Sequence, residues 1–204
     1  MERGETYLGT GKSPARLLAL AEENVMQVEE RDTTRNGETS VRLPWLLNAW
    51  YAADWSANLQ PGKLVARTIL SKPLVLFRKP DGGVAAIADY CTHRLAPLSA
   101  GKLLANGHVQ CGYHGLEYDG TGACVLNPHG NGKIPPAAIV PSYTIVEKHE
   151  MAWIWIGLAP PDESKIADYS MFDGGSPLYR SEQDYLRINA PYTLVIDNLM
   201  DLTH

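Results

Sequence analysis

Two short stretches, CTHRLAPL (residues 91–98) and CGYHG (residues 111–115), decide how the fold of this 204-residue sequence is interpreted. Each stretch contains one cysteine and one histidine, and 17 residues separate His93 from Cys111. Thiolate and imidazole groups in paired short loops are ligands for zinc or for an iron–sulfur cluster. The motif therefore predicts a metal centre formed by two loops.

The distribution of the ligands between the loops favours an iron–sulfur cluster. Structural zinc sites usually pair cysteine with cysteine and histidine with histidine. One cysteine and one histidine per loop suit a Rieske [2Fe-2S] cluster, in which two thiolates hold one iron and two imidazoles hold the other. We expect Cys91, Cys111, His93 and His114 to be these ligands. A mixed-ligand zinc site and four unrelated side chains are the alternatives.

The composition is that of an ordinary globular chain, with 45% apolar and 20% charged residues. A net charge of -5 and a pI near 5.7 argue against a nucleic-acid-binding surface. The three cysteines argue against a disulfide-stapled secreted domain. No apolar run approaches the roughly 18 residues that span a bilayer. We therefore expect a cytoplasmic protein with neither nucleic acid nor membrane as a partner.

The chain divides into three parts. Residues 1–43 form a polar extension with one helical pattern, which begins at Ser13-Pro14. Residues 44–160 contain short β-rich runs between turn signals such as Pro80-Asp81-Gly82-Gly83. The expected strands are 64–70, 73–78, 84–90, 107–110, 116–118, 123–126, 143–146 and 152–156. This spacing predicts a mainly β domain, either a sandwich or a small barrel.

Residues 161–204 have a different pattern, which we interpret as the start of a second, incomplete domain. The pattern is loop-like over 167–182 and extended over 185–196, and a helix is expected from Asp197 onward. On that helix Asn198, Asp201 and His204 would lie within an arc of about 120° and could face one site. A helix cap at Asn198, with Asp201 in the first turn, is the alternative.

The two cluster stretches and several neighbouring segments resemble Rieske-type non-haem iron aromatic ring-hydroxylating oxygenases. The similar segments include residues 48–51, 127–132 and 197–203, and they resemble most the subgroup containing vanillate O-demethylase oxygenase and dicamba monooxygenase. The resemblance covers roughly residues 45–204. It implies a Rieske β-sandwich domain followed by the start of an α+β catalytic domain that binds a mononuclear Fe(II).

The resemblance also implies roles for the C-terminal residues and for partners. His204 matches the first histidine ligand of the mononuclear iron, and Asn198 matches a residue often found beside that iron. Asp201 matches the acid that links the Rieske histidine of a neighbouring subunit to the iron-bound histidine. The implied partners are a ferredoxin or flavin-dependent reductase using NAD(P)H, an aromatic substrate and two further copies in a homotrimer.

Departures from the family pattern limit what this chain is expected to do. The sequence lacks the second histidine and the carboxylate of the facial triad, so we expect it to pass single electrons without completing oxygen activation. Leu116 stands where respiratory Rieske proteins carry a hydroxyl residue, which predicts a low cluster potential. A stand-alone Rieske ferredoxin and a structural zinc module are the alternatives.

Overall fold

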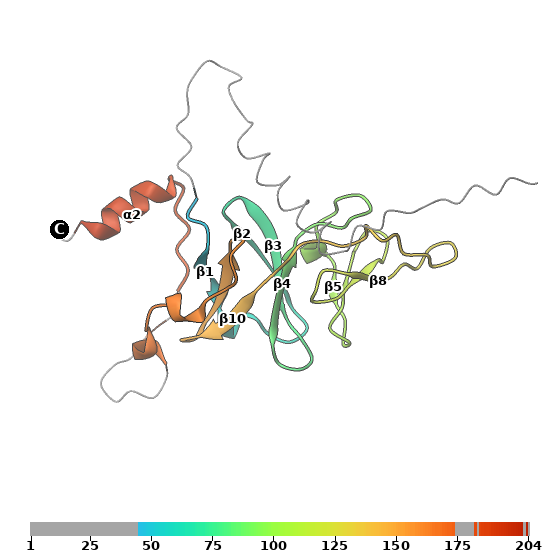
Figure 1. Ribbon diagram of the computed structural model, residues 1–204, viewed down its shortest axis with the longest axis horizontal. Helices are drawn as coiled ribbons and strands as arrows, with labels where there is room; N and C mark the ends of the chain where they lie inside the picture. The colour runs from blue at the N-terminus through green and yellow to red at the C-terminus, as the bar shows by residue number, and fades with distance from the viewer. Residues whose placement is uncertain (1–44, 174–181, 183, 202, 204) are drawn as a thin grey trace, which may run out of the picture. The chain divides into compact units, whose positions relative to one another are not determined.

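The computed structural model describes residues 45–173, 182, 184–201 and 203 (Figure 1). The helix expected within residues 1–43 lies outside the described residues. The chain separates into two units, one ending at Asp168 and one beginning at Tyr169.

The first unit consists of three antiparallel sheets. Sheet A has the order β1 (Ala49–Trp55), β11 (Met151–Ile156) and β10 (Ile145–Lys148). Sheet B has the order β2 (Leu64–Ile69), β3 (Lys72–Arg78), β4 (Val84–Ala88) and β9 (Ser142–Tyr143). Sheet C has the order β5 (Lys102–Leu103), β6 (Val109–Gln110), β7 (Glu117–Tyr118) and β8 (Cys124–Leu126). Short 3-10 helices are η1 (Ser56–Asn58), η2 (Leu98–Ala100) and η3 (Glu163–Lys165).

Sheet B lies between two hydrophobic cores. Residues 74–77 of β3 are all buried, because alternate side chains of a strand point to opposite faces and both faces are covered here. Val75 and Phe77 pack into the core that contains Val109 and other residues of sheet C. Leu74 and Leu76 pack into the core that contains residues of sheet A. Figure 1 shows β5 and β8 at one end of this unit, β1 and β10 at the other, and β3 and β4 between them.

Most of the expected strands are present, which confirms the mainly β prediction. The run 64–70 forms β2, the run 73–78 forms β3, and the run 84–90 is shortened to β4. The final expected pair, 143–146 and 152–156, forms β10 and β11. These strands pair antiparallel, with Ile145 opposite Ile154. The strand β1 was not among the expected strands. It is an edge strand of sheet A, and it pairs with β11 between Ala49 and Trp55.

The second unit contains η4 (Ser170–Phe172) and α2 (Tyr192–Met200). The expectation of an extended segment over 185–196 is wrong for its last five residues, because the helix begins directly after Pro191, earlier than Asp197. The helix also ends where we expected it to continue. Asp201 has an extended backbone, and its carboxylate accepts hydrogen bonds from the amide of Thr203 at 3.0 Å and from its hydroxyl at 2.5 Å. Such a local side-chain turn competes with helical hydrogen bonding.

Among the described residues, no helix has both the length and the apolar character needed to cross a membrane.

Candidate metal centre

The first cysteine–histidine loop connects β4 to η2 and is closed by its own backbone. The amide of Cys91 donates to the carbonyl oxygen of Ala96 at 2.8 Å, and the amide of Leu95 donates to the carbonyl oxygen of Cys91 at 2.9 Å. Leu95 has a φ of 56°, in the left-handed region that non-glycine residues rarely adopt. The reversal leaves the Leu95 side chain exposed and Cys91 buried.

The second loop connects β6 to β7 and repeats the same backbone pattern 20 residues later. The amide of Cys111 donates to the carbonyl oxygen of Leu116 at 2.8 Å, and the amide of Gly115 donates to the carbonyl oxygen of Cys111 at 3.0 Å. Gly115 has a φ of 74° and corresponds to Leu95 of the first loop. The two loops are therefore equivalent in backbone structure, with a cysteine at the start of each.

The two histidines occupy different positions in these equivalent loops, and their rings nevertheless meet. His93 is the second residue after its cysteine, and His114 is the third. The Nδ1 atoms of the two rings lie 3.1 Å apart, and the ring centroids lie 4.6 Å apart. His93 is exposed and His114 is half-buried, whereas Cys91 and Cys111 are only 1% and 3% exposed.

The donor set fits a [2Fe-2S] cluster with mixed ligands. The two thiols are buried in one hydrophobic core, and the two imidazoles meet where they are less buried. A cluster with one iron held by sulfur and one by nitrogen requires this set of two thiolates and two imidazoles. Within the part of the chain that the structure describes, no three histidine, cysteine or carboxylate side chains converge as ligands of a single ion. One buried cysteine and one more exposed histidine in each loop are the ligands that such a cluster needs.

The electrostatic surroundings of His114 favour the neutral ring that a metal ligand must have. Desolvation lowers the pKa of His114, and the neighbouring His93, His129 and Arg94 lower it further. All these effects oppose a positive charge on the ring.

Tyr118 is a site residue that the sequence interpretation missed. Its hydroxyl lies 3.4 Å from the Cys91 Sγ, 3.0 Å from the amide nitrogen of Thr92 and 2.8 Å from the Thr92 Oγ1. Burial raises the pKa of Tyr118, and the hydrogen bond to Cys91 raises it further, so the hydroxyl stays protonated. A thiolate at Cys91 only accepts hydrogen bonds, so Tyr118 would donate to the sulfur and accept from both Thr92 donors.

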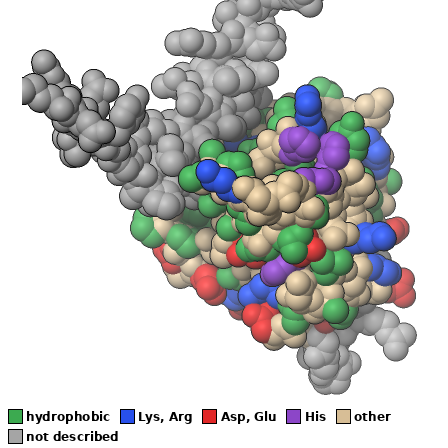
Figure 2. All heavy atoms as spheres, turned by 90° about the vertical axis from the view of Figure 1, so that its right-hand side faces the viewer, with side chains coloured by type: hydrophobic (Ala, Val, Ile, Leu, Met, Phe, Trp, Pro, Cys, Tyr) green, Lys and Arg blue, Asp and Glu red, His purple; other side chains and the backbone are tan. Residues whose placement is uncertain are grey.

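A third histidine lies beside the two in the loops. The Nε2 atom of His129 is 2.7 Å from the carbonyl oxygen of His114, and the two rings meet edge to face with centroids 5.9 Å apart. Figure 2 shows histidine side chains gathered on this face of the unit. A hollow of about 510 Å³ adjoins them and is lined by His93, His114, His129, Asn127 and neighbouring apolar residues.

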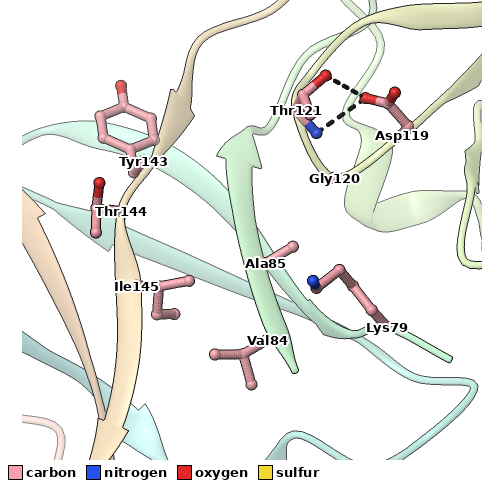
Figure 3. A pocket seen from close by; sticks show the side chains of 9 residues that line it. All are labelled: Lys79, Val84, Ala85, Asp119, Gly120, Thr121, Tyr143, Thr144 and Ile145. Carbon is pink, nitrogen blue, oxygen red and sulfur yellow. Dashed lines mark hydrogen bonds between the residues drawn. The ribbon is translucent and has the colours of Figure 1, made fainter. Parts of the chain in front are cut away.

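A second hollow, of about 380 Å³, lies apart from the cluster loops (Figure 3). Its lining includes Lys79, Asp119 and Thr121 and contains no histidine or cysteine. The Asp119 carboxylate accepts hydrogen bonds from the amide and hydroxyl of Thr121, at 2.9 and 2.6 Å, and Lys79 pairs with Asp81 at 2.9 Å. Lys79, Asp119 and Thr121 thus bind one another or neighbouring side chains.

Of the three predicted C-terminal residues, Asn198 and Asp201 are described, and they do not both lie on the helix. Asn198 lies in α2, and Asp201 follows the helix with its carboxylate bound to Thr203. The alternative in which Asn198 caps the start of a helix is wrong, because α2 begins six residues earlier, at Tyr192. His204 lies outside the described residues.

The fold and the two loops define the class of this protein. Residues 49–144 match the Rieske [2Fe-2S] domain family, so the chain carries a Rieske domain whose cofactor is a [2Fe-2S] cluster. Across most of its length the chain is related to Rieske non-haem iron oxygenases. It is 48% identical over 163 residues to the oxygenase component of dicamba O-demethylase from Stenotrophomonas maltophilia, covering 79% of this chain and 47% of that protein.

Other relatives agree with this assignment. The chain is 34% identical over 161 residues to the vanillate O-demethylase oxygenase subunit of Pseudomonas sp. (strain HR199 / DSM 7063), covering 77% of the chain and 43% of that subunit. A crystal structure of dicamba monooxygenase with non-heme iron and dicamba superposes with a TM-score of 0.72 at 48% identity, covering 79% of this chain and 49% of that one. The chain spans about half the length of the curated relatives it matches.

Proposed function

We propose that this chain is the electron-transferring part of a Rieske oxygenase that acts on an aromatic compound. Cys91 and Cys111 would hold one iron of the cluster, and His93 and His114 would hold the other. The observation that carries this assignment is the 3.1 Å approach of the two Nδ1 atoms, in two loops that each begin with a buried cysteine. When bound, the cluster takes up and releases one electron at a time.

The protein surroundings of the two pairs differ in a way that supports this role. The two cysteines, at the starts of the loops, are buried, and the Tyr118 hydroxyl lies within hydrogen-bonding distance of the Cys91 sulfur. His93 is at the surface, so a redox partner can approach its ring directly. The chain therefore shields the sulfur ligands from water and leaves the imidazole side accessible for electron exchange.

The similarity to oxygenases favours this function over that of a stand-alone electron carrier. The relationship to the dicamba O-demethylase component covers 163 residues, well beyond the Rieske domain at residues 49–144. We propose domain limits of 44–160 for the Rieske part and 161–204 for the start of a catalytic part that binds Fe(II), with residues 1–43 as an extension. Asn198, Asp201 and His204 would belong to the catalytic part.

The remaining partners follow from the same relationship. We propose a ferredoxin or flavin-dependent reductase as the electron donor and an aromatic small molecule as the substrate, with O₂ activated at the mononuclear iron. Asp201 would connect the Rieske histidines of one copy to the iron of the next in a homotrimer located in the cytoplasm. Size-exclusion chromatography with light scattering tests the assembly. A trimer supports it, and a protein that stays monomeric at all concentrations contradicts it.

An anaerobic titration with dithionite tests the electron-transfer function. The purified chain is expected to take up about one electron per molecule and to develop the electron paramagnetic resonance signal of a reduced Rieske cluster. Air should restore the oxidised visible spectrum. A metal-loaded protein that takes up no electron, as a zinc protein would, contradicts the proposal.

A further inference from the structure

His129 contacts a proposed cluster ligand from outside both cluster loops. It lies in the segment 127–133, which follows β8, and its Nε2 atom is 2.7 Å from the carbonyl oxygen of His114. A carbonyl oxygen only accepts hydrogen bonds, so the Nε2 atom must carry the proton in this contact. The geometry thus fixes His129 as the donor.

The segment around His129 is held in place by its own hydrogen bonds. The Asn127 side chain accepts from the amide of His129 at 3.1 Å and donates to the carbonyl oxygen of Lys133 at 2.9 Å. The amide of Gly132 donates to the carbonyl oxygen of His129 at 3.0 Å, and the Asn131 side chain accepts from the amide of Lys133 at 3.1 Å. His129 therefore projects from a braced turn that places its Nε2 atom at the His114 carbonyl oxygen.

The contact from His129 lies at the less buried of the two proposed ligands in the second loop. Cys111 is anchored at 3% exposure, whereas His114 is half-buried and adjoins the hollow of about 510 Å³. Two backbone hydrogen bonds close the second loop and join Cys111 to Gly115 and Leu116. Neither bond uses the carbonyl oxygen of His114. The bond from His129 therefore adds a second restraint to the peptide group between His114 and Gly115, whose amide already donates to the carbonyl oxygen of Cys111.

We infer that His129 is a positioning residue for the cluster: its Nε2–H group holds the His114 carbonyl and thereby keeps the His114 ring in the orientation that faces His93. This inference rests on the proposed function, because it requires His114 to be a cluster ligand. His129 itself would not bind iron. Hydrogen-bonded groups behind metal ligands commonly change metal affinity by about 10- to 100-fold when they are removed.

Three variants of the full chain separate the donor from the ring and from the turn. His129→Gln retains an N–H donor near the Nε2 position and removes the ring, and His129→Phe retains a ring and removes the donor. Asn131→Ala weakens the turn without removing the contact to His114, and it serves as the matched control. Thermal unfolding of each variant establishes that it is folded before the cluster is examined.

The measurements are the rate of iron release to a chelator, the electron paramagnetic resonance g values and the midpoint potential of the cluster. We expect His129→Phe to release iron about 10-fold faster than the unchanged chain and to show altered g values and potential. His129→Gln and Asn131→Ala should stay within about 3-fold of the unchanged chain in release rate, on the same reasoning.

Two results overturn the inference. One is a folded His129→Phe variant whose release rate, g values and potential all match those of the unchanged chain. The other is equal damage in His129→Gln and His129→Phe, which would show that the retained donor has no effect. An unchanged chain that never acquires a [2Fe-2S] cluster would refute the proposed function itself, and the two failures are thereby distinguished.

Discussion

The Nδ1 atoms of His93 and His114 face each other at 3.1 Å, although the two histidines occupy non-equivalent positions in loops of equivalent backbone structure. In the first loop the residue that corresponds to His114 is Arg94, and in the second loop the residue that corresponds to His93 is Tyr113. The Tyr113 ring lies against the His114 ring, with centroids 3.9 Å apart. The two motifs, C-x-H in the first loop and C-x-x-H in the second, therefore place their histidines at different loop positions, and the two Nδ1 atoms still meet.

Replacing either loop cysteine should abolish the cluster. Cys91→Ala and Cys111→Ala each remove one of the two proposed sulfur ligands of one iron, so we expect iron and sulfide content to fall at least about 10-fold. Cys124→Ala is the matched control, because Cys124 is also a buried thiol and its Sγ contacts the Leu126 carbonyl oxygen. Metal analysis of the three variants measures the effect. Equal cluster content in all three would contradict the ligand assignment.

Removing the Tyr118 hydroxyl should lower the cluster potential. A hydrogen bond to a ligating sulfur stabilises the reduced, more negative form, so its loss in Tyr118→Phe makes reduction less favourable. A net hydrogen-bond contribution of about 1 kcal/mol corresponds to roughly 40 mV for one electron. A potentiometric titration measures the shift.

The control for this change is Tyr51→Phe, because the Tyr51 hydroxyl donates to the Leu46 carbonyl oxygen at 2.5 Å and not to a sulfur. Its cluster potential should equal that of the unchanged chain. A Tyr118→Phe potential that is unchanged or higher would show that the hydroxyl does not donate to Cys91.

The proposed cluster ligands could be named from the sequence because their chemistry is confined to two short stretches. Tyr118 and His129 were not, because their contacts depend on how separate segments fold against the loops. Leu116 carries no hydroxyl, yet a hydroxyl reaches the Cys91 sulfur from Tyr118, which follows two residues later in β7. This contact weighs against the expectation of a low potential, which depended on fewer hydrogen bonds to sulfur.

Substitution of Gly122 should destabilise the first unit strongly. Gly122 has a φ of 82°, and an added Cβ would overlap the carbonyl oxygen of Val140, whose amide donates to the Gly122 carbonyl at 2.9 Å. Gly122→Ala should cost about 2 to 4 kcal/mol in the free energy of unfolding, because backbone strain and overlap add.

Gly62→Ala is the matched control for backbone strain alone. Gly62 has a φ of 76° and open space around its Cα, so we expect a cost of about 1 to 2 kcal/mol. Denaturant unfolding of both variants measures the difference. Equal losses would show that Val140 moves away without cost.

The ion pair between Arg78 and Glu147 should make stability depend on pH. Two hydrogen bonds, of 2.9 and 2.6 Å, join the Arg78 guanidinium at the end of β3 to the Glu147 carboxylate in β10, and so connect sheets B and A. The bonds from Arg78 lower the pKa of Glu147 below its usual value. The stabilisation is therefore fully present above the unfolded-state pKa and disappears as the pH falls through the lower folded-state value.

Glu147→Gln tests this dependence. We expect the variant to lose about 1 kcal/mol of unfolding free energy at pH 7, because a bidentate charged pair becomes a neutral contact. The difference from the unchanged chain should shrink below about pH 4, where the unchanged carboxyl group also becomes protonated. Chemical denaturation at several pH values measures it. A difference that stays constant across this range would contradict the electrostatic explanation.

The predicted strands and the missed elements have a common physical explanation. β3 was recognisable because residues 74–77 are apolar on both faces, as a strand between two cores requires. β1 was missed because its residues, Ala49–Trp55, are mostly half-buried and it owes its register to pairing with the distant β11. The end of α2 was misplaced because Asp201 forms a turn with Thr203, a local competition that helical spacing does not reveal.

The central claim is that two thiols and two imidazoles of this chain hold a two-iron cluster. The most direct test is the iron and acid-labile sulfide content of the anaerobically purified chain, together with its reduced electron paramagnetic resonance spectrum. We predict about two iron and two sulfide per chain and a Rieske-type signal. A colourless protein that contains zinc, or iron without sulfide, would contradict the claim.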